Sequence, residues 1–330
     1  MTNPIAVTTN AEKKKIIPVG ALQQTLAFAS LIALILFFSI ASSNFLQWSN
    51  IIGILLSTAV IGILALGATF VIITGGIDLS VGTVMTLSSV MTGVLVVNSG
   101  LPMIIGVMGG IATGAFCGLL CGVMITKLKI PPFISTLAMM MVAKGLALVI
   151  SNAAPIYFLE HPLFTKIALG SIIPGVNIPN AVLIFFVMAI IGGIILSKTI
   201  LGRYNFAIGS NEEATRLSGV NVNFWKISIY TLAGAFTGIA GVLMASRLNS
   251  AQPALGQGYE LEAIAAVVIG GTSLSGGKGS IVGTVIGALI MSVLTNGLRI
   301  LSIPQEWQTV VVGLVIILAV FIDVVRRRNE

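Results

Sequence analysis

Long runs of apolar residues, most of them long enough to cross a lipid bilayer, dominate this sequence. About 20 consecutive apolar residues span the hydrocarbon core as a helix, and runs bounded by charge or by Pro, Gly and Asn mark the candidates. Ten segments meet this description: residues 25–41, 51–73, 79–97, 103–125, 133–150, 181–196, 227–245, 261–271, 281–298 and 307–325. Nine are long enough to span, and 261–271 is short. The pattern predicts an all-α polytopic membrane protein with about ten transmembrane helices.

The distribution of Lys and Arg decides how the short segment 261–271 is interpreted. Such a segment either crosses as a broken helix or enters the bilayer and returns. With ten crossings and a cytoplasmic N-terminus, 13 of the 17 Lys and Arg residues fall in inner loops, three in outer loops, and Lys144 inside a segment. A re-entrant segment would leave ten inside and six outside. Cytoplasmic loops carry the excess of cations, so we expect ten crossings with both termini cytoplasmic.

Composition agrees with the lipid bilayer as the main surroundings of the chain. Of its 330 residues, 56% are hydrophobic and only 8% are charged, against about 25% charged in soluble proteins. The net charge of +7 follows from the topology, and no basic folded surface indicates a nucleic-acid partner. We expect one transmembrane domain over residues 21–325 between cytoplasmic tails 1–20 and 326–330. Cys117 and Cys121 are expected to be buried free thiols, with no metal site.

The longest inner loop, residues 197–226, contains the signals of a short helix. Ser210 or Asn211 would cap it, and Glu213, three residues after Ser210, completes a capping box. Gly219 supplies the stop. Glu212 and Glu213 in the first turn and Arg216 in the last suit the helix dipole. The helix is either an ordinary solvated surface helix or a docking element for a cytoplasmic protein, and its defined ends favour docking. The residues of this candidate site are Ser210, Asn211, Glu212, Glu213, Arg216 and Gly219.

A second motif, residues 75–82, separates the second and third segments. The adjacent glycines Gly75 and Gly76 permit a sharp helix break and close backbone packing. Asp78 follows them, and an ionised Asp near the bilayer centre costs about 2.5–3.5 kcal/mol on insertion scales. Asp78 is therefore expected either to cap a helix beginning at Leu79 or to face water on a transport path.

A third motif, residues 270–280, resembles the second. Gly75 and Gly76 recur as Gly270 and Gly271, and the tetrapeptide VGTV at 81–84 recurs at 282–285. These similarities indicate an internal repeat with parallel copies, of the kind that places broken helices at corresponding positions in transporters. Coincidence remains the alternative in a chain with 37 glycines.

The same motif superficially resembles a phosphate-binding loop at Gly277-Lys278. The spacing does not match, because Thr272 stands where the first glycine belongs and Gly279 where Ser or Thr follows the lysine. No nucleotide site is expected in this chain. ATP and Mg, if used, would bind a separate ATPase subunit.

Taken together, the motifs resemble the ribose-type branch of bacterial sugar ABC transporter permeases (carbohydrate uptake family 2). The resemblance extends over nearly all of residues 45–323. It rests on GGIDLSVG from Gly75, LGR from Leu201, GSNEEATRLSGVNV from Gly209, NGL from Asn296, and RLNSAQPALGQGYELEAIAAVVIGGTSLSGGKGSIVGT from Arg247. The chain departs from the pattern at Ser210, where similar proteins often carry Gly.

The resemblance implies the partners and the location. Residues 211–219 look like the coupling helix that binds a groove of a cytoplasmic ABC ATPase. An extracytoplasmic sugar-binding protein and a second permease copy or paralogue are also implied, all in a bacterial cell (inner) membrane. The chain would be a transport subunit without enzyme activity or a cofactor of its own.

The expected function is import of a monosaccharide, ribose or similar, by alternating access. Polar residues in apolar surroundings either line the path or hold helices together. An ion-coupled secondary transporter, relying on Asp78 and Lys144, is one alternative, and a passive channel or an ABC permease for a non-sugar solute are others. The path candidates, besides Gly75, Gly76, Asp78, Gly270 and Gly271, are Asn98, Ser135, Thr136, Asn152, Asn249, Gln252 and Asn296.

Overall fold

The computed structural model describes residues 19–172 and 177–328. The expected N-terminal tail, residues 1–20, therefore lies almost wholly outside the described residues, as do residues 329–330 of the C-terminal tail. Residues 326–328 continue the last helix. The long helices are α1 (Val19–Ala41), α2 (Trp48–Ile73), α3 (Val81–Gly93, continued by the π-helix η1, Val94–Asn98), α4 (Met103–Thr126), α5 (Pro132–Ile150), α7 (Asn180–Lys198), α10 (Val222–Leu248), α12 (Ile281–Ile300) and α13 (Gln305–Arg328). The shorter elements are β1 (Ile156–Tyr157), α6 (Pro162–Leu169), α8 (Ile200–Ser210), α9 (Glu212–Leu217), β2 (Ser250–Ala251) and α11 (Tyr259–Ile269).

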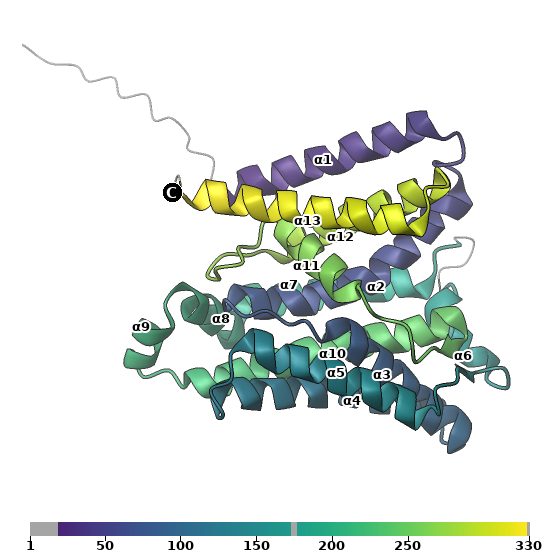
Figure 1. Ribbon diagram of the computed structural model, residues 1–330, viewed down its shortest axis with the longest axis horizontal. Helices are drawn as coiled ribbons and strands as arrows, with labels where there is room; N and C mark the ends of the chain where they lie inside the picture. Colours follow the sequence, from purple (N-terminus) through teal and green to yellow (C-terminus); the bar gives the residue numbers. More distant parts are fainter. Residues whose placement is uncertain (1–18, 173–176, 329–330) are drawn as a thin grey trace, which may run out of the picture.

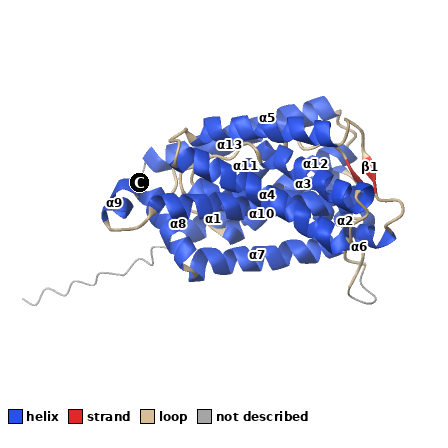
Figure 2. Ribbon diagram, turned by 90° about the horizontal axis from the view of Figure 1, so that it is seen from below, coloured by secondary structure: helices blue, strands red, loops and turns tan. Residues whose placement is uncertain are grey.

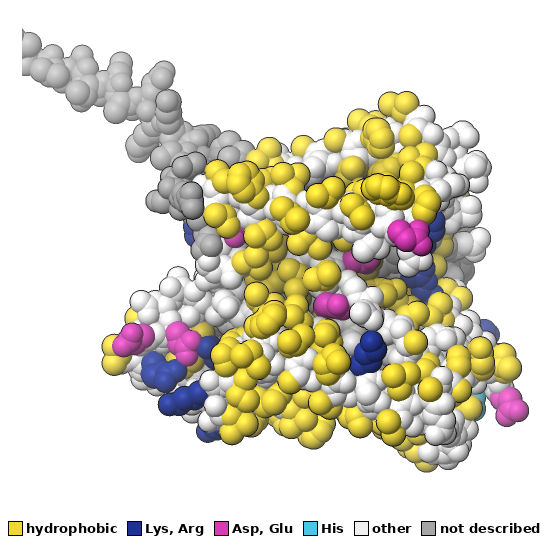
Figure 3. Space-filling view, viewed as in Figure 1, with side chains coloured by type: hydrophobic (Ala, Val, Ile, Leu, Met, Phe, Trp, Pro, Cys, Tyr) yellow, Lys and Arg dark blue, Asp and Glu magenta, His cyan; other side chains and the backbone are white. Residues whose placement is uncertain are grey.

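The helices form one elongated bundle with two distinct ends. Figure 1 places α8, α9 and the C-terminal end of α13 at one end and α6 at the other, and Figure 2 places β1 beside α6. We call these the inner end and the outer end, following the predicted topology. Between them apolar side chains cover most of the visible face, while Lys and Arg gather near α9 (Figure 3). Within the described residues, nine helices are long and apolar enough to span a bilayer, so the chain is an all-α polytopic membrane protein.

The short eighth segment crosses the bundle as well. It begins at the outer end, where β2 pairs antiparallel with β1 through Ala251 and Ile156. It reaches the inner end at Gly277, whose amide donates to the Ile73 carbonyl at the end of α2 (2.9 Å). Between these two points the chain consists mainly of the non-helical residues 252–258 and the 11-residue helix α11. This course from one end of the bundle to the other agrees with the expected ten crossings rather than with a re-entrant segment. Nine of the described helices are long enough to span a membrane, so the tenth crossing and the end that faces the cytoplasm stay predictions.

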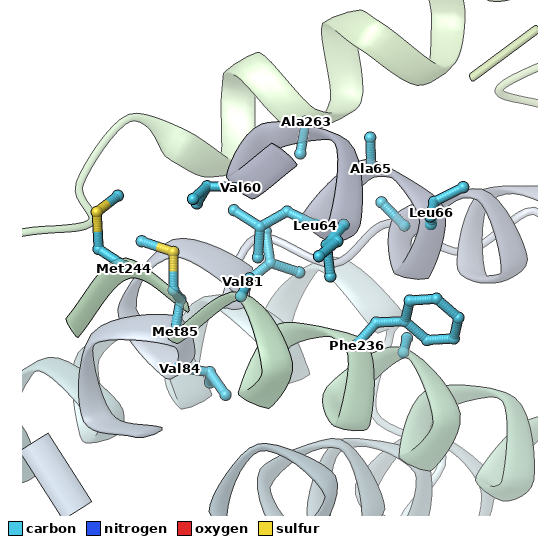
Figure 4. Close-up of a cluster of buried hydrophobic side chains, with 14 of the residues drawn as sticks. Val60, Leu64, Ala65, Leu66, Val81, Val84, Met85, Phe236, Met244 and Ala263 are labelled. Carbon is cyan, nitrogen blue, oxygen red and sulfur yellow. The ribbon is translucent and has the colours of Figure 1, made fainter. Parts of the chain in front are cut away.

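The core lies between α2, α3, α10 and α11. About 70% of the membrane-length windows of α2, α3 and α10 is buried, whereas none of the α13 window is. Figure 4 shows Leu64 of α2, Val81 of α3, Phe236 of α10 and Ala263 of α11 in one cluster. Helices α2, α3 and α10 therefore form the interior of the bundle, and α13 lies at its edge.

Helices α4 and α10 approach closely because both carry small residues at the contact. Gly114 of α4 faces Gly234 and Gly238 of α10, and Gly118 faces Gly234 and the Tyr230 backbone. Small residues let transmembrane helices pack backbone to backbone. This interface was not among the expectations from the sequence, although glycines recur every fourth residue along α4. They are Gly106, Gly110, Gly114, Gly118 and Gly122.

Candidate functional site

The predicted short helix exists as α9, with one of its two proposed caps. Asn211 has extended backbone geometry, and its Oδ1 accepts from the Ala214 amide (2.9 Å), as a helix N-cap does. Ser210 instead ends the preceding helix α8. The capping box of Ser210 and Glu213 is therefore wrong: α8 was not predicted, and its presence moves the helix start by one residue.

Glu212 is the charged residue that ties α9 to the bundle. Its carboxylate accepts from Arg216 one turn later (2.9 Å) and from Lys226 of α10 (2.6 Å). Partial burial by itself raises the pKa of Glu212, but the hydrogen bond and charge of Lys226, together with Arg216, outweigh burial and hold the pKa below its usual value. Since a lowered pKa means that the folded state prefers the carboxylate, these contacts stabilise the position of α9.

The stabilisation of α9 by Glu212 is expected to change with pH only in the acidic range, below the ordinary pKa of 4.5. A carboxyl whose pKa is lower folded than unfolded contributes its full stabilisation above the ordinary value of 4.5 and loses it as the pH falls through the folded pKa. Hydrogen exchange should therefore show amides 212–217 better protected in the wild type than in Glu212→Gln near neutral pH. The difference should vanish in strong acid. A difference that grows below pH 4.5 would contradict this assignment.

The C-terminal end of α9 is an exposed tip. Gly219 has φ +85°, and its amide donates to Arg216, while Val220 donates to Thr215. This is the left-handed stop expected from sequence. Leu217 beside it is 83% exposed. The tip is therefore defined in conformation and accessible to another protein.

The end of α8 rests on both glycine motifs. Gly209 lies so close to the Ile73 carbonyl that a Cβ there would collide with it, and the Gly277 amide would be 2.5 Å away. Gly276 in turn lies against Gly75. The α8–α9 hairpin therefore contacts the turn that follows α2 and the turn that precedes α12 at one point.

The two glycine motifs end their helices in the same way, but with a shift of one residue. Gly75 (φ +78°) and Gly271 (φ +91°) are the equivalent left-handed positions after α2 and α11. The amides that follow, of Gly76 and Thr272, donate back to Val71 and Val267 respectively. The proposed alignment of Gly75 with Gly270 is therefore wrong by one. Both turns connect a helix arriving at the inner end to one leaving it, as the parallel alignment expected.

Replacing Gly75 should test the left-handed turn. Gly75→Val is expected to lower transport strongly, because a left-handed conformation costs an L-residue about 1–2 kcal/mol and is worse for a β-branched one. Gly75→Asn should be much milder, since Asn tolerates this region. The measurement is substrate uptake normalised to the amount of membrane-inserted protein. Equal uptake by the two variants would remove the conformational explanation.

Asp78 is buried and does not cap a helix in the expected way. Only 5% of it is exposed, and its Oδ1 accepts from the amide (2.8 Å) and hydroxyl (2.6 Å) of Ser80. The helix begins at Val81 rather than Leu79, with Ser80 at the N-cap, so the capping prediction is wrong. Residues 76–80 are non-helical and lead into α3, and the buried hydroxyl of Tyr230 faces Gly76.

The path candidates Asn249, Gln252 and Asn296 are dispersed, and each makes a side-chain hydrogen bond. Asn249 ends α10 with φ +53° and accepts from Thr165 (2.9 Å). Gln252 donates to Ser250 (2.9 Å), and Asn296 donates to Asn50 of α2 (3.0 Å). Lys144 lies 3.4 Å from the Gln257 amide oxygen. The bonds of Asn249 and Asn296 join distant segments, that of Gln252 is local, and a path role for the three candidates stays a prediction.

Helices α3 and α11 are each preceded by a non-helical segment, residues 76–80 and 252–258, and we call them the two broken helices. With them and the α8–α9 hairpin at the inner end, the described bundle has the architecture of a multi-pass transport protein. Residues 50–320 match the family model described as the branched-chain amino acid transport system permease component. The chain belongs to this family, and it is a transport component of the bacterial cell (inner) membrane and not an enzyme.

Several curated proteins are similar over nearly their whole length. The ribose import permease protein RbsC of Bacillus subtilis (strain 168) is 43% identical over 94% of this chain and 96% of its own. RbsC of Escherichia coli (strain K12) is 44% identical over 89% and 92%. The fructose import permease protein FrcC of Rhizobium meliloti is 38% identical over 88% and 82%. No solved structure gives a significant match.

Proposed function

We propose that this chain is the membrane-spanning subunit of an ATP-driven importer for a monosaccharide, with ribose as the first substrate to test. The observation that carries the proposal is the inner hairpin α8–α9, which presents an exposed tip to a partner and contacts the turns next to two broken helices. Similarity to ribose import permeases at 43–44% identity supports the substrate class. The family description keeps branched-chain amino acids as an alternative substrate.

In this proposal the work is divided among subunits. A cytoplasmic ATPase holds ATP and Mg and binds α9, an extracytoplasmic binding protein delivers the sugar, and two permease copies or paralogues form the path. Closure of the ATPases displaces α9, and α8 passes the displacement to the turns at Gly75 and Gly276. The permease binds sugar hydroxyls by hydrogen bonds and performs no covalent step. The ends of the broken helices are where irregular backbone is available for such bonds.

Reconstitution tests the proposal. The permease, with the ATPase and binding protein encoded beside it, is placed in vesicles holding ATP and Mg, and labelled ribose, fructose, xylose, allose and leucine are added outside. We expect uptake of a sugar that stops without ATP and persists when ion gradients are collapsed. Uptake driven by an ion gradient without ATP would overturn the proposal in favour of a secondary transporter, and uptake of leucine alone would overturn the substrate class.

A further inference from the structure

The two broken helices meet inside the bundle, N-terminus to N-terminus. Helix α3 starts at Val81 and runs to the outer end, whereas α11 starts at Tyr259 and runs to the inner end. At their meeting point Gly82 lies against the Gly256 backbone, so that a Cβ on either glycine would collide with the other residue. Thr86 donates its hydroxyl to the Leu255 carbonyl (2.6 Å). We call Gly82, Thr86, Leu255, Gly256 and Glu260 the helix junction.

A buried carboxylate lies at the centre of the helix junction. Glu260, in the first turn of α11, is 8% exposed and accepts from the Gly258 amide through both oxygens (3.0 and 3.1 Å). Its Oε2 also lies only 2.6 Å from where a Cβ on Gly82 would be. The carboxylate therefore faces the first turn of α3 as well as its own helix. Its negative charge is favourable at the positive ends of both helix dipoles.

We propose that Glu260 is a positioning residue that holds the N-terminal ends of α3 and α11 together, and that opening of the helix junction gives access to the transport path from the outer side. The proposal rests on the proposed function, because opening is assigned to the ATP-driven step. Two observations link the helix junction to that step. Helices α3 and α11 each adjoin a glycine turn, at Gly75 and Gly271, and the α8–α9 hairpin contacts this turn region through Gly209.

The geometry also explains why the helix junction is suited to separate. The polar contacts of the helix junction are the hydroxyl bond of Thr86 and the carboxylate of Glu260. Beside them Val81 and Met85 of α3 and Ala263 of α11 belong to one apolar cluster (Figure 4). Gly82 and Gly256 meet backbone to backbone, so that at this point no side chain lies between the two segments. Polar bonds between two rigid helices break and re-form at little cost when another arrangement offers water or a substrate hydroxyl.

Labelling at Leu255 tests the proposal directly. In a background where Cys117 and Cys121 are serine, Leu255→Cys leaves the backbone carbonyl that Thr86 binds, and a membrane-impermeant maleimide is applied from the outer side. In the resting complex with its ATPase we expect slow labelling, and at least tenfold faster labelling when vanadate traps nucleotide on the ATPase. Adding Glu260→Gln, which keeps the shape and an acceptor oxygen but removes the charge, should make labelling fast in both states and reduce transport per ATP hydrolysed at least tenfold.

Glu306→Gln is the matched control, because Glu306 is also a first-turn carboxylate but is exposed on α13. It should behave like the parent. Thermal unfolding of every variant is measured in detergent, so that loss of fold is separated from opening. Parent-like labelling and coupling in a folded Glu260→Gln variant would overturn the role of Glu260. Failure of the wild type to import a sugar would overturn the proposed function instead, because the labelling comparison between parent and Glu260→Gln does not depend on the substrate.

Discussion

Replacing Gly118 by valine is expected to prevent accumulation of folded protein in the membrane. A Cβ at this position would overlap the Tyr230 carbonyl and lie 3.1 Å from the Gly234 Cα. Both neighbours are backbone atoms of α10, so no side chain is free to rotate away. Overpacking usually costs about 1–3 kcal/mol and sometimes more, and here α4 and α10 would have to separate along their length. We expect no monodisperse peak in fluorescence-detected size-exclusion chromatography.

The control uses the same substitution where the chain offers room. Gly145 of α5 and Gly193 of α7 also lie in membrane-length helices, and nothing lies within 4 Å of a Cβ at either position. Gly145→Val and Gly193→Val should therefore accumulate and elute like the wild type. Normal behaviour of Gly118→Val, or an equal loss in the two controls, would show that backbone approach of α4 and α10 does not determine stability.

Reversing the charge of Glu212 is expected to abolish coupled transport while leaving the bundle intact. Glu212→Lys would place a cation beside Lys226 and Arg216 and at the N-terminal end of α9, where the helix dipole disfavours it. The Glu212 side chain is 40% exposed, so the substitution should change the stability of the whole bundle little. Its main effect should be to displace α9. We expect co-purification of the ATPase and binding-protein-stimulated ATP hydrolysis to fall at least tenfold.

Exchanging the charges of Glu212 and Lys226 tests whether the expected loss comes from this ion pair or from any change of charge on the surface of α9. The double variant Glu212→Lys with Lys226→Glu restores an opposite pair between α9 and α10 and should recover a substantial part of ATPase binding. Lys226→Glu alone should resemble Glu212→Lys, because two carboxylates then face each other. Failure of the double variant to exceed either single variant would mean that the contact between α9 and Lys226 does not position the hairpin.

Much of the fold follows from the sequence because the bilayer imposes a simple rule on it. Apolar length located the membrane-spanning segments, since backbone in lipid must form complete helices, and the Lys and Arg distribution led to the prediction of ten crossings. Local chemistry was equally reliable at the left-handed Gly219. At the other end of α9 the sequence left Ser210 and Asn211 as alternative caps, and only the structure selected Asn211. The family was also recognisable, because its motifs are contiguous in sequence.

Contacts between distant segments required the tertiary structure. Ser210 satisfies the capping pattern, yet it is the last residue of the unpredicted helix α8. Asp78 bonds to Ser80 within its own turn, because α3 begins two residues later than expected. Glu260 was overlooked because a first-turn glutamate is common. What makes it unusual is that the N-terminal end of α3, some 180 residues earlier in the chain, lies against it. Sequence thus determined which segments cross and where helices stop, whereas only packing decided that the two broken helices meet at the helix junction and that Gly209 brings the hairpin against the turns beside them.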